Sequence, residues 1–154
     1  GQRFGLLLTA EDCAVHQFEP LPTPTGLFAW TAPVNRSVRP TAATVDAFSV
    51  QAVKSGAMAG EAHFGLSCAQ AEADEPVADG LARWARELAL DCIVTPRLPL
   101  GPMRKAVHAA CSSQGLTLVE VTRAYDQAVW PHARAGFFGL KKKIPAILAS
   151  LSLT

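Results

Sequence analysis

The sequence lacks the features by which membrane spans, zinc sites and common nucleotide sites are usually found. No uninterrupted apolar run in the 154-residue sequence approaches the length of about eighteen residues that indicates a membrane span, so no membrane span is expected. Its start, Gly1-Gln-Arg-Phe, is not followed by the charged and apolar segments of a signal peptide. Four cysteines (13, 68, 92 and 111) form no CxxC pair, which argues against a tetrahedral metal site and favours reduced core thiols in a cytoplasmic protein. Walker, GxGxxG and GxSxG motifs are all missing.

Net charge is close to zero, but the two halves of the chain differ in sign. Residues 1–80 carry four Lys or Arg against nine Asp or Glu, whereas residues 81–154 carry ten against four. The second half therefore either faces an anion or acidic partner, or presents an ordinary mixed surface.

Apolar runs alternate with helical patterns along most of the chain. Strands are predicted at 4–9, 27–32, 64–70, 92–95 and 116–122, and helices at 41–60, 76–88 and 102–114. Because the strands are continuously apolar and helices separate most of them, a parallel sheet covered on both faces is expected. The sequence thus predicts an α/β protein with a doubly wound, Rossmann-like parallel sheet of about five strands. This domain is expected to span 1–140, and 141–154 to begin a connector or a C-terminal helix.

Each predicted helix carries apolar residues at helical spacing, which indicates the face that packs on the sheet. These residues are Val45, Phe48, Ala52 and Val53 in the first helix, Val77, Leu81, Trp84, Ala85 and Leu88 in the second, and Met103, Val107, Ala110 and Cys111 in the third.

Ligands of open α/β sheets bind beyond the carboxyl ends of the strands, which directs attention to the loops that follow them. The loop TPRLPLGPMRK (95–105) ends at a helix N-terminus marked by Gly101 and Pro102, and Arg97, Arg104 and Lys105 add positive charge. A phosphate or carboxylate could be held there, and the alternative is a stiff, proline-rich surface loop.

Other polar residues give weaker indications. Glu11 and Asp12 follow the first strand and would either orient a ligand hydroxyl or a cation, or cap a turn. His108 and Cys111 stand three residues apart on one predicted helix, a spacing more typical of a core thiol beside a surface histidine than of a catalytic pair. No catalytic residue is predicted.

The segment WPHARAGFFGLKKKIP (130–145) combines aromatic and basic residues. Pro131, Gly136 and Gly139 interrupt it, so it is not expected to be one continuous helix. Exposed aromatics beside lysines can bind single-stranded nucleic acid. The favoured interpretation is an interface with another protein surface, because the segment has more apolar residues than the edge of a single domain needs for its own packing.

Residues 91–145, DCIVTPRLPLGPMRKAVHAACSSQGLTLVEVTRAYDQAVWPHARAGFFGLKKKIP, resemble the second half of the N-terminal α/β domain of the DNA photolyase/cryptochrome family. In that family a strand, a helix and a last strand lead to an acidic residue and an aromatic, proline-containing segment, places that Asp126 and 130–138 would fill. The resemblance implies an antenna-type domain in DNA repair or light sensing that holds a folate, a deazaflavin, a flavin or no chromophore. It also implies that FAD binds only to a helical flavin domain of a longer parent, docked through Trp130, Phe137 and Phe138. The domain alone is then no enzyme, although such a parent could be a photolyase-like lyase.

By position, the resemblance places six residues in the chromophore crevice: Thr9, Glu11, Arg97, Gly101, Met103 and Arg104. The alternative is a free-standing nucleotide-binding module similar to universal stress proteins, which would bind nucleotide at the 95–104 loop and form a homodimer. A small enzyme on the same fold is a third possibility. Direct nucleic-acid binding by this domain alone is not expected.

Overall fold

The structure is a computed structural model that describes residues 1–18, 21–34, 39–134 and 136–152. The chain divides into two units, Gly1–Val121 and Thr122–Thr154, each of which is described by itself. In its described residues, the first unit holds five strands and four helices: β1 (Phe4–Leu8), the 3-10 helix η1 (Val15–Gln17), β2 (Gly26–Ala29), α1 (Ala43–Phe64), β3 (Cys68–Ala69), α2 (Val77–Glu87), β4 (Cys92–Pro96), α3 (Pro102–Ser113) and β5 (Leu118–Val121).

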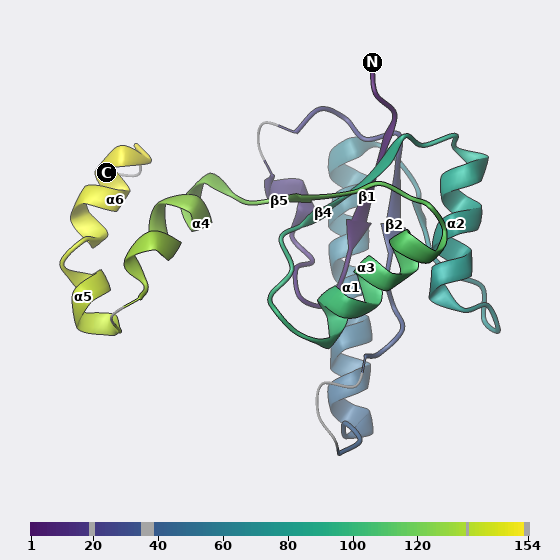
Figure 1. Ribbon diagram of the computed structural model, residues 1–154, viewed down its shortest axis with the longest axis horizontal. Coiled ribbons are helices and arrows are strands. Elements are labelled where there is room, and N and C mark those ends of the chain that lie inside the picture. The colour runs from purple at the N-terminus through teal and green to yellow at the C-terminus, as the bar shows by residue number, and fades with distance from the viewer. Residues whose placement is uncertain (19–20, 35–38, 135, 153–154) are drawn as a thin grey trace. The chain divides into compact units, whose positions relative to one another are not determined.

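The five strands form one sheet in the order β3-β2-β1-β4-β5, and every neighbouring pair is parallel. One apolar cluster joins α2 and α3 to one face of the sheet, and a second cluster joins η1 and α1 to the other face. Figure 1 shows α1 behind the sheet and α3 in front of it. The predicted doubly wound α/β sheet of about five strands with helices on both faces is therefore confirmed.

The core forms where the apolar runs of the sequence predict it. Every residue of β2 and β4 is buried, as is β1 from Gly5 onward. Trp84 of α2 lies across the two glycines that begin the β1–β2 pairing, Gly5 and Gly26, and a Cβ on Gly5 would overlap its ring. The rings of Trp84 and Phe28 are 5.3 Å apart between centroids. Trp84 is 5% exposed, so the predicted inward face of α2 is confirmed, and Met103, Val107, Ala110 and Cys111 of α3 are likewise buried.

The first helix differs from its prediction in length and in its buried face. It runs to Phe64 and is ended by Gly65, whose φ of 66° is left-handed, so that only Cys68–Ala69 remains of the strand predicted at 64–70. Val45 and Phe48, expected to face the sheet, are exposed.

The reason is that α1 approaches its neighbours through small residues. Its buried residues are Val53, Gly56 and Gly60, and a Cβ on Gly56 would overlap the backbone carbonyl of Cys13. Since α1 is apolar on most sides, the spacing of its large apolar residues does not reveal which side is buried.

The second unit consists of α4 (Ala124–Val129), the 3-10 helix η2 (Trp130–His132), α5 (Phe137–Lys141) and α6 (Ile144–Ser150). The aromatic segment is thus interrupted as predicted. Phe137 and Phe138 are 64% and 78% exposed, and Trp130 is also exposed. The unit begins at Thr122, whereas the sequence placed the start of the connector at 141. Over the described residues, no helix combines the length and apolar character needed to cross a membrane.

Candidate ligand site at the carboxyl edge of the sheet

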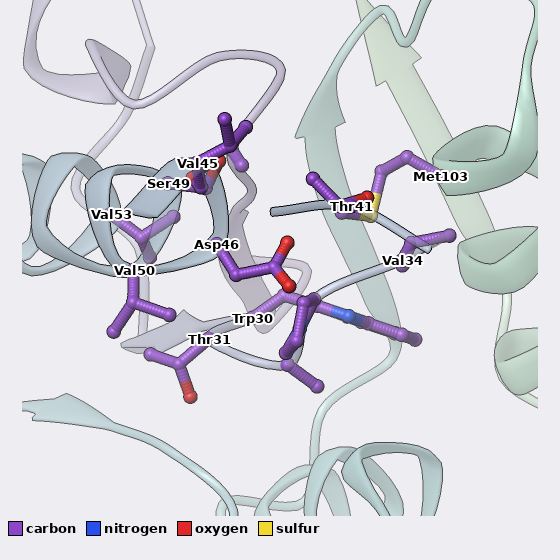
Figure 2. Close-up of a pocket in the computed structure, with 13 residues that line it drawn as sticks. Trp30, Thr31, Val34, Thr41, Val45, Asp46, Ser49, Val50, Val53 and Met103 are labelled. Carbon is purple, nitrogen blue, oxygen red and sulfur yellow. Dashed lines mark hydrogen bonds between the residues drawn. The ribbon is translucent and has the colours of Figure 1, made fainter. Parts of the chain in front are cut away.

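A pocket lies at the carboxyl edge of the sheet, close to the point where the strand order reverses. From β1 the chain moves outward through β2 to β3 and then crosses back to β4, on the other side of β1. Such crossings are where open α/β sheets bind ligands. The pocket is lined by residues that follow β1 and β2, by the first turns of α1 and by Met103 of α3 (Figure 2).

Trp30 is the most informative residue of this pocket. It directly follows β2, and its backbone N–H donates to the carbonyl of Leu8 at 2.9 Å, which extends the pairing with β1 by one residue. Its side chain is 6% exposed, and its Nε1 is buried without a hydrogen-bond partner. Among the described residues, His16 Nδ1 is the other buried side-chain nitrogen in this condition. A buried donor without an acceptor costs about 1–3 kcal/mol, so an unpaired nitrogen in a residue that lines a pocket suggests that an acceptor belongs nearby.

Asp46 supplies the matching acceptor group. It lies in the first turn of α1, and in Figure 2 its carboxylate points into the pocket that the indole of Trp30 also lines. The hydroxyl of Ser49 lines the same pocket but donates to the carbonyl of Val45 at 3.0 Å. Most of the remaining wall is apolar, and hydrogen bonds are strengthened in such low-dielectric surroundings. A donor and a carboxylate therefore face one small, largely apolar space.

The size of the space limits what it can hold. Its cavity volume is about 20 Å³, which suits a single water molecule or one polar group of a ligand, since one water needs roughly 10–15 Å³. A larger groove of about 440 Å³ adjoins it and shares Thr31, Ala32 and Val50 as lining residues. That volume is in the usual range for small-molecule sites. The geometry thus offers an inner cavity for one polar group and an outer groove for the body of a ligand.

The six residues placed in the crevice by resemblance do not form one cluster. Met103 is buried and lines the inner cavity. Thr9 is buried, and its hydroxyl accepts a hydrogen bond from the backbone N–H of Glu11 at 3.3 Å, so that it stabilises the turn after β1. Gly101 and Arg104 line a separate, open pocket along α3. Arg97 is exposed, and its backbone N–H donates to the carbonyl of Val121 at 2.7 Å.

Arg104 is bound within the fold. Its guanidinium donates two hydrogen bonds to the carboxylate of Glu120, from Nε at 3.0 Å and from Nη2 at 2.7 Å. These bonds raise the pKa of Arg104 and hold the pKa of Glu120 below its ordinary value. The same carboxylate accepts a hydrogen bond from the backbone N–H of Leu98. Arg104 therefore ties α3 to β5, which reduces the positive charge that the 95–105 loop can offer an anion.

The cysteines show no sign of reactivity. Burial raises the pKa of Cys68 to about 12 and that of Cys111 to about 11, so both are neutral thiols near pH 7. Cys111 is 1% exposed, and the neighbouring His108 lies 3.5 Å from Glu120. Within the described ranges, no three His, Cys, Asp or Glu side chains are grouped so as to hold a metal ion.

Sequence reasoning missed Trp30 and Asp46 for different reasons. Trp30 was assigned to the strand predicted at 27–32, so it was not among the loop residues regarded as candidates. Asp46 stands in the first turn of a helix, where an acidic residue is ordinarily explained by the helix dipole. The available signal was an acidic residue in the first turn of the helix that follows β2, the strand beside β1.

The candidate site therefore consists of a buried N–H without an acceptor, a carboxylate and an adjoining groove. The membership of the photolyase/cryptochrome family predicted from residues 91–145 stays a prediction. No family model, no curated protein and no solved structure matches this chain.

Proposed function

We propose that residues 1–121 form a small-molecule-binding α/β domain that holds a ligand hydroxyl between Trp30 and Asp46. The observation that carries the proposal is the buried, unpaired Nε1 of Trp30, a residue that lines the inner cavity. A hydroxyl can accept from the indole N–H and donate to the carboxylate at the same time. An ammonium group has no lone pair for the indole, and a bare anion would meet Asp46, so neither suits the cavity as well.

The ribityl chain of a flavin or deazaflavin presents hydroxyls of this kind. In this proposal the domain is an antenna-type module of a photolyase/cryptochrome-like protein, as the resemblance of residues 91–145 predicts. The parallel β3-β2-β1-β4-β5 sheet and the short helices that follow β5 are compatible with that role. The domain would then bind a chromophore or serve as a scaffold, while any FAD would belong to a helical flavin domain of a longer parent.

The second unit would provide the contact with that helical domain or with another protein surface. Phe137 and Phe138 expose most of their ring surface next to three consecutive lysines, 141–143. Exposed aromatic clusters of this kind mark interaction surfaces.

A nucleotide-binding module similar to universal stress proteins is the second candidate. The ribose of a nucleotide offers the same hydroxyl chemistry to Trp30 and Asp46, and the 440 Å³ groove has room for a base. This candidate shares the site with the first and differs in the ligand.

The test is a binding measurement on the full chain with three hydroxyl-bearing ligands, riboflavin, adenosine and ATP, monitored by near-UV and visible absorption and by calorimetry. We expect at least one of the three to bind and Trp30→Phe to weaken it about tenfold, the equivalent of one hydrogen bond of about 1.4 kcal/mol. Asp46→Asn should weaken it similarly. Trp130→Phe, in the other unit, is the matched control.

Two results would contradict the proposal. One is that none of the three ligands binds at about 1 mM. The other is that Trp30→Phe binds the ligand as tightly as Trp130→Phe does.

A further inference from the structure

We infer that this site selects an uncharged, hydroxyl-bearing ligand and discriminates against the phosphorylated form of the same molecule. The inference rests on the proposed function, since it concerns the ligand of the same cavity and groove, and it favours a flavin or a nucleoside over the nucleotide of the second candidate. Two observations support it. One is the set of charged side chains that line the inner cavity and the outer groove, and the other is that backbone N–H groups nearby already donate hydrogen bonds within the chain.

The lining of the cavity and groove is acidic. Among the described residues, Asp46 is the one charged group in the inner cavity, and the outer groove carries Lys54, Glu72 and Glu75. Three carboxylates therefore face one ammonium. A phosphate would add one or two further negative charges to this space.

Arg83 moderates this charge without reversing it. Its Nη2 lies 2.9 Å from Glu75 and 3.7 Å from Glu72, and its Nη1 lies 3.4 Å from Glu87. Its hydrogen bonds to Glu75 lower the pKa of that carboxyl to about 2, so Glu75 is ionised throughout the neutral range. One guanidinium shared among three carboxylates cannot also neutralise a ligand phosphate.

Much of the loop after β1 uses its backbone N–H groups within the loop itself. In phosphate-binding α/β proteins, backbone N–H groups of this loop point at the anion. Here the N–H of Glu11 donates to the Thr9 hydroxyl, the N–H of Asp12 donates to the Thr9 carbonyl at 3.2 Å, and the N–H of Ala14 donates to the Asp12 carboxylate at 3.1 Å.

The basic residues of the 95–105 loop belong to a different place. Arg104 and Lys105 line an open pocket with Leu100, Gly101 and His108, and that pocket shares no lining residue with the cavity or the groove. Arg104 is moreover bound to Glu120. Among the described lining residues of the cavity and the groove, a phosphate on a ligand held by Trp30 therefore meets more carboxylates than cations.

The experiment compares two matched ligand pairs, riboflavin with FMN and adenosine with AMP, by calorimetry on the full chain. At low salt we expect at least one uncharged member to bind and its phosphorylated partner to bind about tenfold more weakly or not at all. Added salt should narrow that ratio, because it screens charge repulsion and leaves a purely steric exclusion unchanged. Glu72→Lys should narrow it as well.

The outcomes separate this inference from the proposed function. If neither riboflavin nor adenosine binds at about 1 mM, both the selectivity and this choice of ligand class fail. An uncharged ligand could bind in a way that depends on Trp30, while its phosphorylated partner binds with equal or higher affinity. That result would refute the selectivity and leave the proposed site in place. A preference that salt and Glu72→Lys leave unchanged would refute its electrostatic basis.

Discussion

Replacing Trp30 by Phe should cost the ligand-free protein little stability or even stabilise it, although Trp30 is among the buried aromatic residues of the core. The indole is 6% exposed and its Nε1 has no partner. Phe fills most of the same volume, and losing the remaining apolar area costs about 1 kcal/mol at about 25 cal/mol per Å². Removing a buried, unpaired donor recovers about 1–3 kcal/mol. The net change should therefore lie between zero and about 2 kcal/mol in favour of Trp30→Phe.

Trp84→Phe is the matched control. Trp84 is 5% exposed in the same apolar cluster, but its nitrogen is not a buried atom without a partner. This variant should lose about 1 kcal/mol of packing with no compensating gain. Trp30→Phe should consequently be more stable than Trp84→Phe by about 1–3 kcal/mol.

Urea unfolding of the three proteins, followed by far-UV circular dichroism, measures the difference. The comparison requires equal m-values, so that the midpoints report stability alone. If Trp30→Phe is destabilised as much as Trp84→Phe, the indole N–H is already paired in solution, and the cavity no longer indicates a place for a ligand hydroxyl.

Three further predictions concern the framework of the site. Trp84→Ala should lower the free energy of unfolding by about 3–5 kcal/mol as a core truncation, and a loss below about 1 kcal/mol in a urea curve would mean that α2 does not bury this ring. Glu75 and Glu120 both have lowered pKa values, Glu75 at about 2 through its hydrogen bonds from Arg83, against an ordinary value of 4.5. Their contributions to stability are present above pH 4.5 and are lost as pH falls through the folded pKa, so Glu75→Gln and Glu120→Gln should each flatten the acid decline below pH 4.5. Urea midpoints at stepped pH would show this, and an unchanged slope in both variants would count against these ion pairs. Gly56→Ala should destabilise by about 1–3 kcal/mol, because its Cβ overlaps a backbone carbonyl. Gly60→Ala, whose Cβ would lie 3.3 Å from a leucine side chain, should be tolerated better, and equal thermal midpoints would contradict the packing of α1.

The parts of the fold that could be predicted are the strands and helices whose apolar pattern fits only one packing arrangement. The apolar runs of β1, β2 and β4 fit only a sheet covered on both faces, and the stripe of α2 containing Trp84 has a polar opposite side. For these elements the pattern of apolar residues determines the buried face.

The buried face of α1 could not be predicted, because it depends on how closely the helix approaches a neighbouring backbone segment. Phe48 is larger and more apolar than Gly56, yet Gly56 is buried and Phe48 is 74% exposed. A helix that must lie against a backbone carbonyl buries its smallest residue there, and the sequence pattern alone does not say where that carbonyl is.

The edge of the sheet at which the cavity lies could be predicted from the sequence, but the residues that give the cavity its chemistry could not. The rule that ligands bind beyond the carboxyl ends of strands leads to the correct edge of the sheet for the cavity. The unpaired state of Trp30, however, depends on which atoms surround one nitrogen, and the pairing of Arg104 with Glu120 depends on the side of β5 from which the carboxylate projects. Both follow from packing between segments that are distant in sequence.

Ligand binding beside Trp30 can be observed in the indole N–H region of a ¹H–¹⁵N spectrum during titration with riboflavin and, separately, with adenosine. The chain has three tryptophans, at positions 30, 84 and 130, and Trp30→Phe identifies the signal of Trp30. We expect one of these ligands to shift the Trp30 signal and to leave the Trp130 signal in place, and we expect no such shift in Asp46→Asn. If neither ligand moves the Trp30 signal, or if binding moves only that of Trp130, the carboxyl edge of this sheet is not the ligand site.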